Sequence, residues 1–131
     1  MTIMYRWFEE VWNKGRESAI DEMSYHDVAG HGLQAPDGNE VSGMESFRAY
    51  FRQMRGALSE IHVVVEDVVT EGDLTVARCV VTAKHTGEGL GKTPKGNSVR
   101  FTGMTMARIK EDKIAEAWNN FDFMTMFQQM E

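Results

Sequence analysis

The sequence predicts an α+β fold in which helices come first and an antiparallel sheet follows. Apolar residues recur at helical spacing up to about residue 57, and from residue 61 the pattern changes to runs of β-branched and aromatic residues. Short polar or glycine-containing breaks separate these runs, which favours strands that follow one another in a meander. A length of 131 residues is typical of one domain, spanning residues 1–131.

Two helices are expected before residue 24. The segment 4–15, MYRWFEEVWNKG, carries large apolar residues at helical spacing, namely Met4, Trp7, Phe8, Val11 and Trp12. Gly15 is a typical helix end. A second, shorter helix is expected over RESAIDEM, residues 16–23.

A loop and a third helix complete the first part of the chain. The segment 25–43 collects glycines, a proline and an Asp-Gly pair, which indicates a loop with room for short strands. Over residues 42–58 one helical face is apolar, formed by Met44, Phe47, Tyr50, Phe51 and Met54. Ser42 and Glu45 have the spacing of a capping box at the start of this helix.

Four antiparallel strands are expected in the second part. They cover residues 61–70, 74–85, 98–109 and 113–121, and the intervening segments contain EGD, the glycine-rich residues 86–97, and KED. The glycine-rich connection is a candidate flexible flap. The end of the chain, FMTMFQQM, has helical spacing and is expected to dock as a short helix.

Both faces of the predicted sheet must be covered. The run IHVVVEDVV is apolar at odd and at even positions, whereas a sheet with one face in water alternates cleanly. The helices can cover one face. The other is most simply covered by a second copy of the chain, so we expect a homodimer.

Composition excludes several functional classes. Fourteen basic and twenty acidic residues give a net charge of −6, which opposes binding to nucleic acid or to an anionic membrane. No apolar stretch has membrane-spanning length, and a cytoplasmic location is expected. The lone Cys79 allows no internal disulfide, and the four histidines have no recognised metal-ligand spacing, so no metal is expected.

Histidines and asparagines are the first candidates for a binding site. His31 lies between two glycines and is either a loop histidine or a side chain facing a pocket. His85 ends a predicted strand where the flap begins. Within the last strand, Asn119 and Asn120 point to opposite sides because side chains alternate, so one of them faces a partly buried surface.

Asp122 follows the last strand directly and has two candidate roles. At the start of the terminal helix it can be an N-cap whose carboxylate accepts backbone N–H bonds. Alternatively it is a proton-transfer group beside the aromatic residues Trp118 and Phe101. Spacing alone leaves both roles open.

Several elements taken together resemble the SnoaL-like polyketide cyclase family. They are VARCVVTAKHTGE, GNSVRFTGMTMARI, DKIAEAWNNFD and the FQQ of the tail, and the first helices and HDVAGHG also fit. The resemblance implies a cone-shaped barrel of the nuclear transport factor two-like superfamily. In that fold, N-terminal helices pack on a strongly curved antiparallel sheet, with a pocket between helices and sheet.

The resemblance also implies a function. It suggests a cofactor-free aldol-type ring closure, or a related isomerase or dehydratase reaction, on a small apolar or aromatic ligand, with Asp122 as the acid/base. Some members carry an acid directly after the tryptophan, where this chain has Asn119. The implied substrate contacts are His31, His85, Phe101, Met104, Met106, Trp118, Asn119, Asn120 and Phe121. The alternative is a non-catalytic binding module of the same fold.

Overall fold

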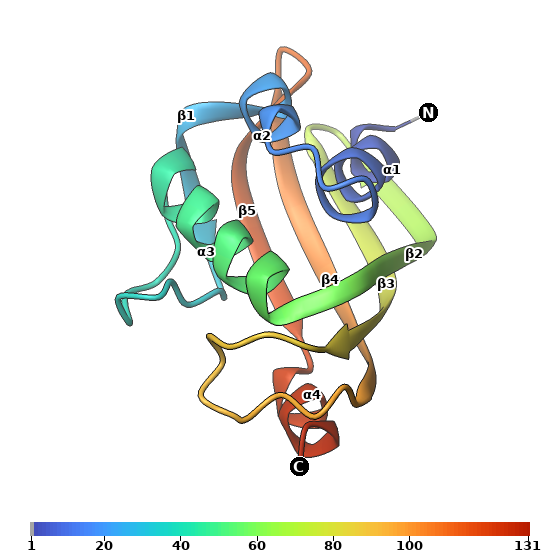
Figure 1. Ribbon diagram of the computed structural model, residues 1–131. Helices are drawn as coiled ribbons and strands as arrows, with labels where there is room; N and C mark the ends of the chain where they lie inside the picture. Colours follow the sequence, from blue (N-terminus) through green and yellow to red (C-terminus); the bar gives the residue numbers. More distant parts are fainter. Residues whose placement is uncertain (1) are drawn as a thin grey trace.

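The computed structural model describes residues 2–131 and has a curved five-stranded sheet with helices in its concave side (Figure 1). The helices are α1 (Ile3–Trp7), the π-helix η1 (Phe8–Asn13), α2 (Ser18–Met23), α3 (Met44–Ala57) and α4 (Phe123–Gln129). The strands are β1 (Ser24–His31), β2 (Leu58–Glu71), β3 (Leu74–His85), β4 (Ser98–Lys110) and β5 (Lys113–Phe121). The α+β class is therefore confirmed.

The sheet has the order β1-β5-β4-β3-β2, and the four predicted strands β2 to β5 form the expected antiparallel meander. Strand β1 was not predicted as a full strand, and it pairs parallel with β5. Its sequence reads as a loop because of Gly30 and Gly32. A β-carbon on Gly30 would lie 2.3 Å from the carbonyl oxygen of Val41, so this strand needs a glycine where the next segment crosses it.

The first predicted helix is divided into α1 and the wider turns of η1. Lys14 directly follows η1, and its N–H donates to the carbonyl of Glu9, five residues earlier, which is the π-helical spacing. Gly15 comes next, with a φ of +67°. The Asn13 side chain then pairs with the backbone of Val63 in β2, donating to its carbonyl at 3.0 Å and accepting from its N–H at 2.6 Å. Helical periodicity alone does not reveal such widened turns.

Helix α3 has the predicted apolar face but not the predicted capping box. Met44, Tyr50 and Met54 are buried against the sheet side of the helix. The N-cap is Gly43, whose φ of +91° suits glycine, and no side chain caps the helix. The Ser42 hydroxyl instead accepts a hydrogen bond from the N–H of Gly30, at 3.1 Å, and so ties the loop to β1.

The inner face of the sheet forms the core with the helices. Alternate residues of β3 from Thr75 to His85 are buried, whereas the residues between them face outward and are partly or fully exposed. Helix α4 closes one end of the sheet through Met126 and through Met130, the residue that follows the helix, and each is 1% exposed. None of the helices within residues 2–131 is long and apolar enough to cross a membrane.

The outer face of the sheet retains exposed apolar side chains. Val64, Met104 and Val69 are 47%, 48% and 67% exposed. A homodimer through this face remains a prediction, and light scattering at micromolar concentration should give twice the chain mass, with Met104→Glu lowering it. A monomeric mass for the unmodified chain would contradict it, since a stable interface buries about 1,000 Å² or more in total.

Candidate functional site

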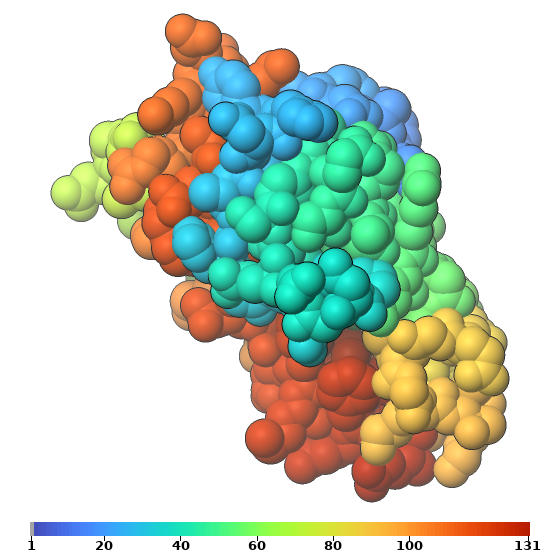
Figure 2. Space-filling model, turned by 90° about the vertical axis from the view of Figure 1, so that its left-hand side faces the viewer, coloured from blue at the N-terminus to red at the C-terminus, as the bar shows by residue number. Residues whose placement is uncertain are grey.

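A cavity lies between the concave face of the sheet and the helices. Its volume is about 110 Å³, and its walls come from α1, η1, α3, the loop after β1 and the inner face of the sheet. Aromatic rings dominate these walls, including Trp7, Phe8, Trp12, Phe47, Tyr50 and Phe101. The segment 32–43 and α3 cover the molecule on the side shown in Figure 2. Together with β1 they form one side of an apolar pocket that is partly open to solvent.

The flap and α4 lie at the lower end of the molecule in both views (Figures 1 and 2). The backbone N–H groups of Thr86 and Gly87 donate to the carbonyl of Ala57 at the end of α3. Farther along, the Gln53 amide donates to the carbonyl of Gly89 at 2.9 Å. The Asn97 side chain donates to the carbonyl of Gln129, at 3.0 Å. The glycine-rich segment is therefore fastened to both neighbouring helices.

Asn119 is the polar group that β5 presents to the cavity, and Asn120 is exposed on the other face. The Asn119 Nδ2 donates to the backbone carbonyl of His31 at 3.1 Å. Its Oδ1 accepts from the Thr105 hydroxyl at 2.9 Å. Because a carbonyl can only accept, the contact with His31 fixes the orientation of the amide. One N–H of this amide is not used by either contact.

Three predicted substrate contacts line this cavity: Phe101, Asn119 and Phe121. The rings of Phe101 and Phe121 meet edge to face with centroids 6.5 Å apart, and both lie near Phe123. Strand alternation brings these residues to one side, as expected from period two. Whether they contact a ligand remains a prediction.

Four other predicted contacts belong to the outer face. Met104, Met106, Trp118 and Asn120 occupy the strand positions between the inward-facing ones, and none of them lines the cavity. The predicted set included odd-numbered and even-numbered residues of β4 and β5, and in this part of the two strands the odd-numbered side chains face the cavity while the even-numbered ones face outward. The positions of these four side chains do not support contact with a ligand in the cavity.

His31 presents its backbone and its ring to different environments. Its carbonyl holds Asn119 in the cavity wall, whereas its Nε2 lies 2.8 Å from a carboxylate oxygen of Glu116. The ring stacks on Trp118 with centroids 5.5 Å apart, and Nδ1 lies 3.9 Å from Glu40. The His31 side chain thus joins an outer-face cluster rather than the pocket.

His85 is completely buried at the end of β3. It pairs across the sheet with Leu58, which does line the cavity, but His85 itself does not. Within residues 2–131 neither ring nitrogen has a hydrogen-bond partner. His85 was predicted as a substrate contact at the end of a strand, and the structure places it in the core near the flap.

Asp122 caps α4. Its carboxylate accepts from the backbone N–H of Thr125 at 3.1 Å and from the Thr125 hydroxyl at 2.6 Å. These hydrogen bonds lower the pKa of Asp122 below its ordinary value of 3.8. The neighbours Phe121 and Phe123 both line the cavity, and Asp122 does not. Of the two roles left open by the sequence, the cap is directly visible.

The cap gives a pH-dependent prediction. Because the folded pKa of Asp122 is lowered, its stabilising effect is present above the unfolded value of about 3.8 and is lost as the pH falls through the lower folded value. Asp122→Ala should lower the melting temperature at pH 7, and the difference from the unmodified protein should become smaller as the pH falls below about 3.8. Asp122→Asn, which keeps a capping side chain, should melt close to the unmodified protein at pH 7. Equal melting of all three proteins at pH 7 would contradict a stabilising cap.

Comparison with known protein families identifies one family for nearly the whole chain. The family model described as SnoaL-like polyketide cyclase matches residues 2–130. The search of curated proteins found no match.

Solved structures resemble the chain along nearly its whole length. A putative SnoaL-like polyketide cyclase from Jannaschia sp. CCS1 is 24% identical with a TM-score of 0.83, covering 97% of this chain and 88% of that one. IdmH, a putative polyketide cyclase from Streptomyces antibioticus, is 26% identical with a TM-score of 0.79, covering 93% and 91%.

A third similar structure is a hypothetical protein with a ketosteroid isomerase-like fold from Catenulispora acidiphila, in complex with trimethylamine. It is 14% identical with a TM-score of 0.78, covering 99% of this chain and 94% of that one. These likenesses agree with the cone-shaped fold.

Proposed function

Because this chain belongs to the SnoaL-like polyketide cyclase family, we propose that it binds a compact, mostly apolar small molecule in the cavity between α3 and the sheet. The observation that carries the proposal is the partly open cavity of about 110 Å³, whose walls are apolar and rich in aromatic rings. Ligand pockets are concave and largely apolar, with a few placed polar groups, and this cavity has that character.

The size of the cavity indicates the size of the ligand. An apolar protein cavity of about 150 Å³ takes benzene. A cavity of about 110 Å³ is smaller, so a molecule of one ring is the size limit and its entry already requires some movement of the walls. Larger ligands need movement of wall side chains, for which Met54 and Met4 are suited because methionine is flexible.

The chemistry of the walls favours binding. Among the residues that the structure describes, those lining the cavity include no aspartate, glutamate, histidine, lysine or arginine. Its neutral polar side chains are Asn119, Thr105, Ser24, Ser42 and Tyr50. Neutral donors of this kind orient an uncharged ligand, so binding is the function that this geometry supports best.

Binding should stabilise the protein against heat, with toluene as the probe. At about ten times its Kd, toluene is expected to raise the free energy of unfolding by about 1.4 kcal/mol. Ala117→Leu, which places a larger side chain in the cavity wall, should abolish this shift. Asn120→Leu, on the outer face of the same strand, should keep it. Equal toluene shifts in the two variants would contradict binding in the cavity.

Ring closure by a cofactor-free acid/base mechanism is the second candidate, and the family description favours it. Asp122 remains its proposed base, and it would have to exchange its bonds to Thr125 for one to the substrate. Turnover of an activated β-dicarbonyl should then fall about a hundredfold or more in Asp122→Asn. Turnover that survives this change and disappears in Asn119→Ala would move the chemistry into the cavity.

A further inference from the structure

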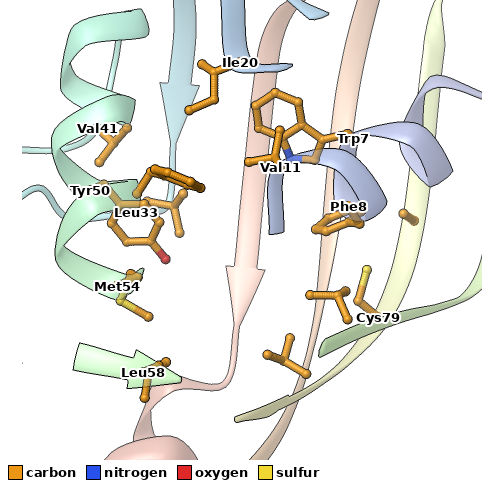
Figure 3. Close-up of a cluster of buried hydrophobic side chains, with 14 of the residues drawn as sticks. Trp7, Phe8, Val11, Ile20, Leu33, Val41, Tyr50, Met54, Leu58 and Cys79 are labelled. Atoms are coloured by element: carbon orange, nitrogen blue, oxygen red, sulfur yellow. The ribbon is translucent and has the colours of Figure 1, made fainter. Parts of the chain in front are cut away.

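Tyr50 holds a phenol at the wall of the cavity. It projects from α3 into the space between this helix and the sheet (Figure 3), and only 7% of its surface is exposed. Aromatic neighbours fix its ring: the Phe47 centroid lies 5.8 Å away, and Trp12 meets it edge to face at 6.1 Å. The position of its hydroxyl is therefore set before any ligand arrives.

The Tyr50 hydroxyl makes no hydrogen bond to another residue in the part of the chain that the structure describes, and, unlike the ring nitrogens of His85, it is not sealed from a water-sized molecule. The other hydroxyls of the cavity wall are engaged. Ser24 donates to the carbonyl of Ile20, Thr105 donates to Asn119, and Ser42 accepts from the N–H of Gly30. Among these four hydroxyls, that of Tyr50 is thus the one that makes no hydrogen bond within the described residues.

The character of this hydroxyl restricts what it binds. Burial raises the pKa of Tyr50 above its ordinary value, so the phenol stays protonated at neutral pH and offers an O–H donor. No cationic side chain among residues 2–131 lines the cavity, so nothing there compensates the charge of an anionic ligand. A neutral oxygen acceptor fits best. The Asn119 amide offers a further donor, the N–H that does not bond to the His31 carbonyl.

We infer that Tyr50 is the specificity-determining residue of the cavity, and that the ligand class is a compact, neutral ketone or aldehyde whose carbonyl oxygen accepts a hydrogen bond from the Tyr50 hydroxyl. The inference rests on the proposed function, because it requires that a small molecule enter the cavity. It adds the polar group that distinguishes the ligand from a hydrocarbon of the same shape.

The test uses two probes that differ only in this group, cyclohexanone and methylenecyclohexane. Their affinities are measured by calorimetric titration for the unmodified protein, for Tyr50→Phe and for Tyr5→Phe. Tyr50→Phe should weaken cyclohexanone about tenfold, the loss of one hydrogen bond, and change methylenecyclohexane less than about twofold. Tyr5→Phe removes a hydroxyl from a residue that does not line the cavity, and it should change neither affinity.

The outcomes separate the inference from the function on which it rests. If Tyr50→Phe leaves cyclohexanone unchanged, or weakens both probes equally, the role of Tyr50 is refuted while binding in the cavity stands. If neither probe binds the unmodified protein, the proposed function fails and the inference fails with it. Tyr50→Phe keeps the ring and removes only a hydroxyl that makes no hydrogen bond within the described residues. We expect it to melt no lower than the unmodified protein, which circular dichroism checks.

Discussion

Met126→Ala is expected to lower the free energy of unfolding by about 2 to 5 kcal/mol, which is the usual cost of truncating a fully buried methionine. Met126 lies in α4 and is 1% exposed, at the end of the core beside β4. Its loss leaves a void that the short helix can close only by moving. The predicted docking of the chain end as a helix is confirmed, and this variant measures how much the docking stabilises the fold.

Met124→Ala is the matched control, because Met124 lies in the same helix and is 74% exposed. It should change the free energy of unfolding by no more than about 0.5 kcal/mol. Urea unfolding followed by tryptophan fluorescence gives both values. A similar small change in both variants would show that α4 contributes little to stability and that the tail is loosely held.

Gly32→Ala is the second change with a large expected effect. Gly32 has a φ of +90°, and a β-carbon there would lie 1.9 Å from the carbonyl oxygen of Asn119. The positive φ costs about 1 to 3 kcal/mol for a residue with a side chain. Moving the β5 backbone adds about 1 to 3 kcal/mol more, the usual cost of overpacking. The same movement displaces Asn119, so toluene binding should weaken as well.

Gly38→Ala is the control that separates the cost of the positive φ from the cost of the steric clash with the Asn119 carbonyl. Gly38 has nearly the same φ, +88°, but nothing lies within 4 Å of its β-carbon position. It should carry only the cost of the strained backbone and leave toluene binding unchanged. If the two alanine variants unfold at the same urea concentration, the close approach of the segment after β1 to β5 does not exist in solution.

The strands could be predicted because β-branched and aromatic runs with clear breaks leave few alternatives. Strand β1 was missed as a full strand because Gly30, which its close contact with Val41 requires, removes the β-strand signal. The π-helical turns of η1 have the same apolar spacing as an ordinary helix. Both features depend on contacts with distant segments, and one sequence does not show such contacts.

The site was predictable only in part. Period two correctly separates Asn119 from Asn120, but it does not say which parity faces the concave side, and that depends on the curvature of the sheet. Tyr50 was assigned to an apolar helix face, and its unpaired hydroxyl becomes visible only when the opposing wall is known. The cap at Asp122, by contrast, was one of the two local alternatives and needed only the start of α4 to be located.

A crystal structure of the protein soaked with cyclohexanone tests the central claim most directly. We predict electron density for the ring inside the cavity, with its oxygen toward Tyr50, and Asp122 still bound to Thr125. An empty cavity in a crystal soaked at a cyclohexanone concentration well above the Kd measured in solution would contradict the claim. So would a ligand held on the outer face of the sheet, or one whose oxygen contacts the Asp122 carboxylate.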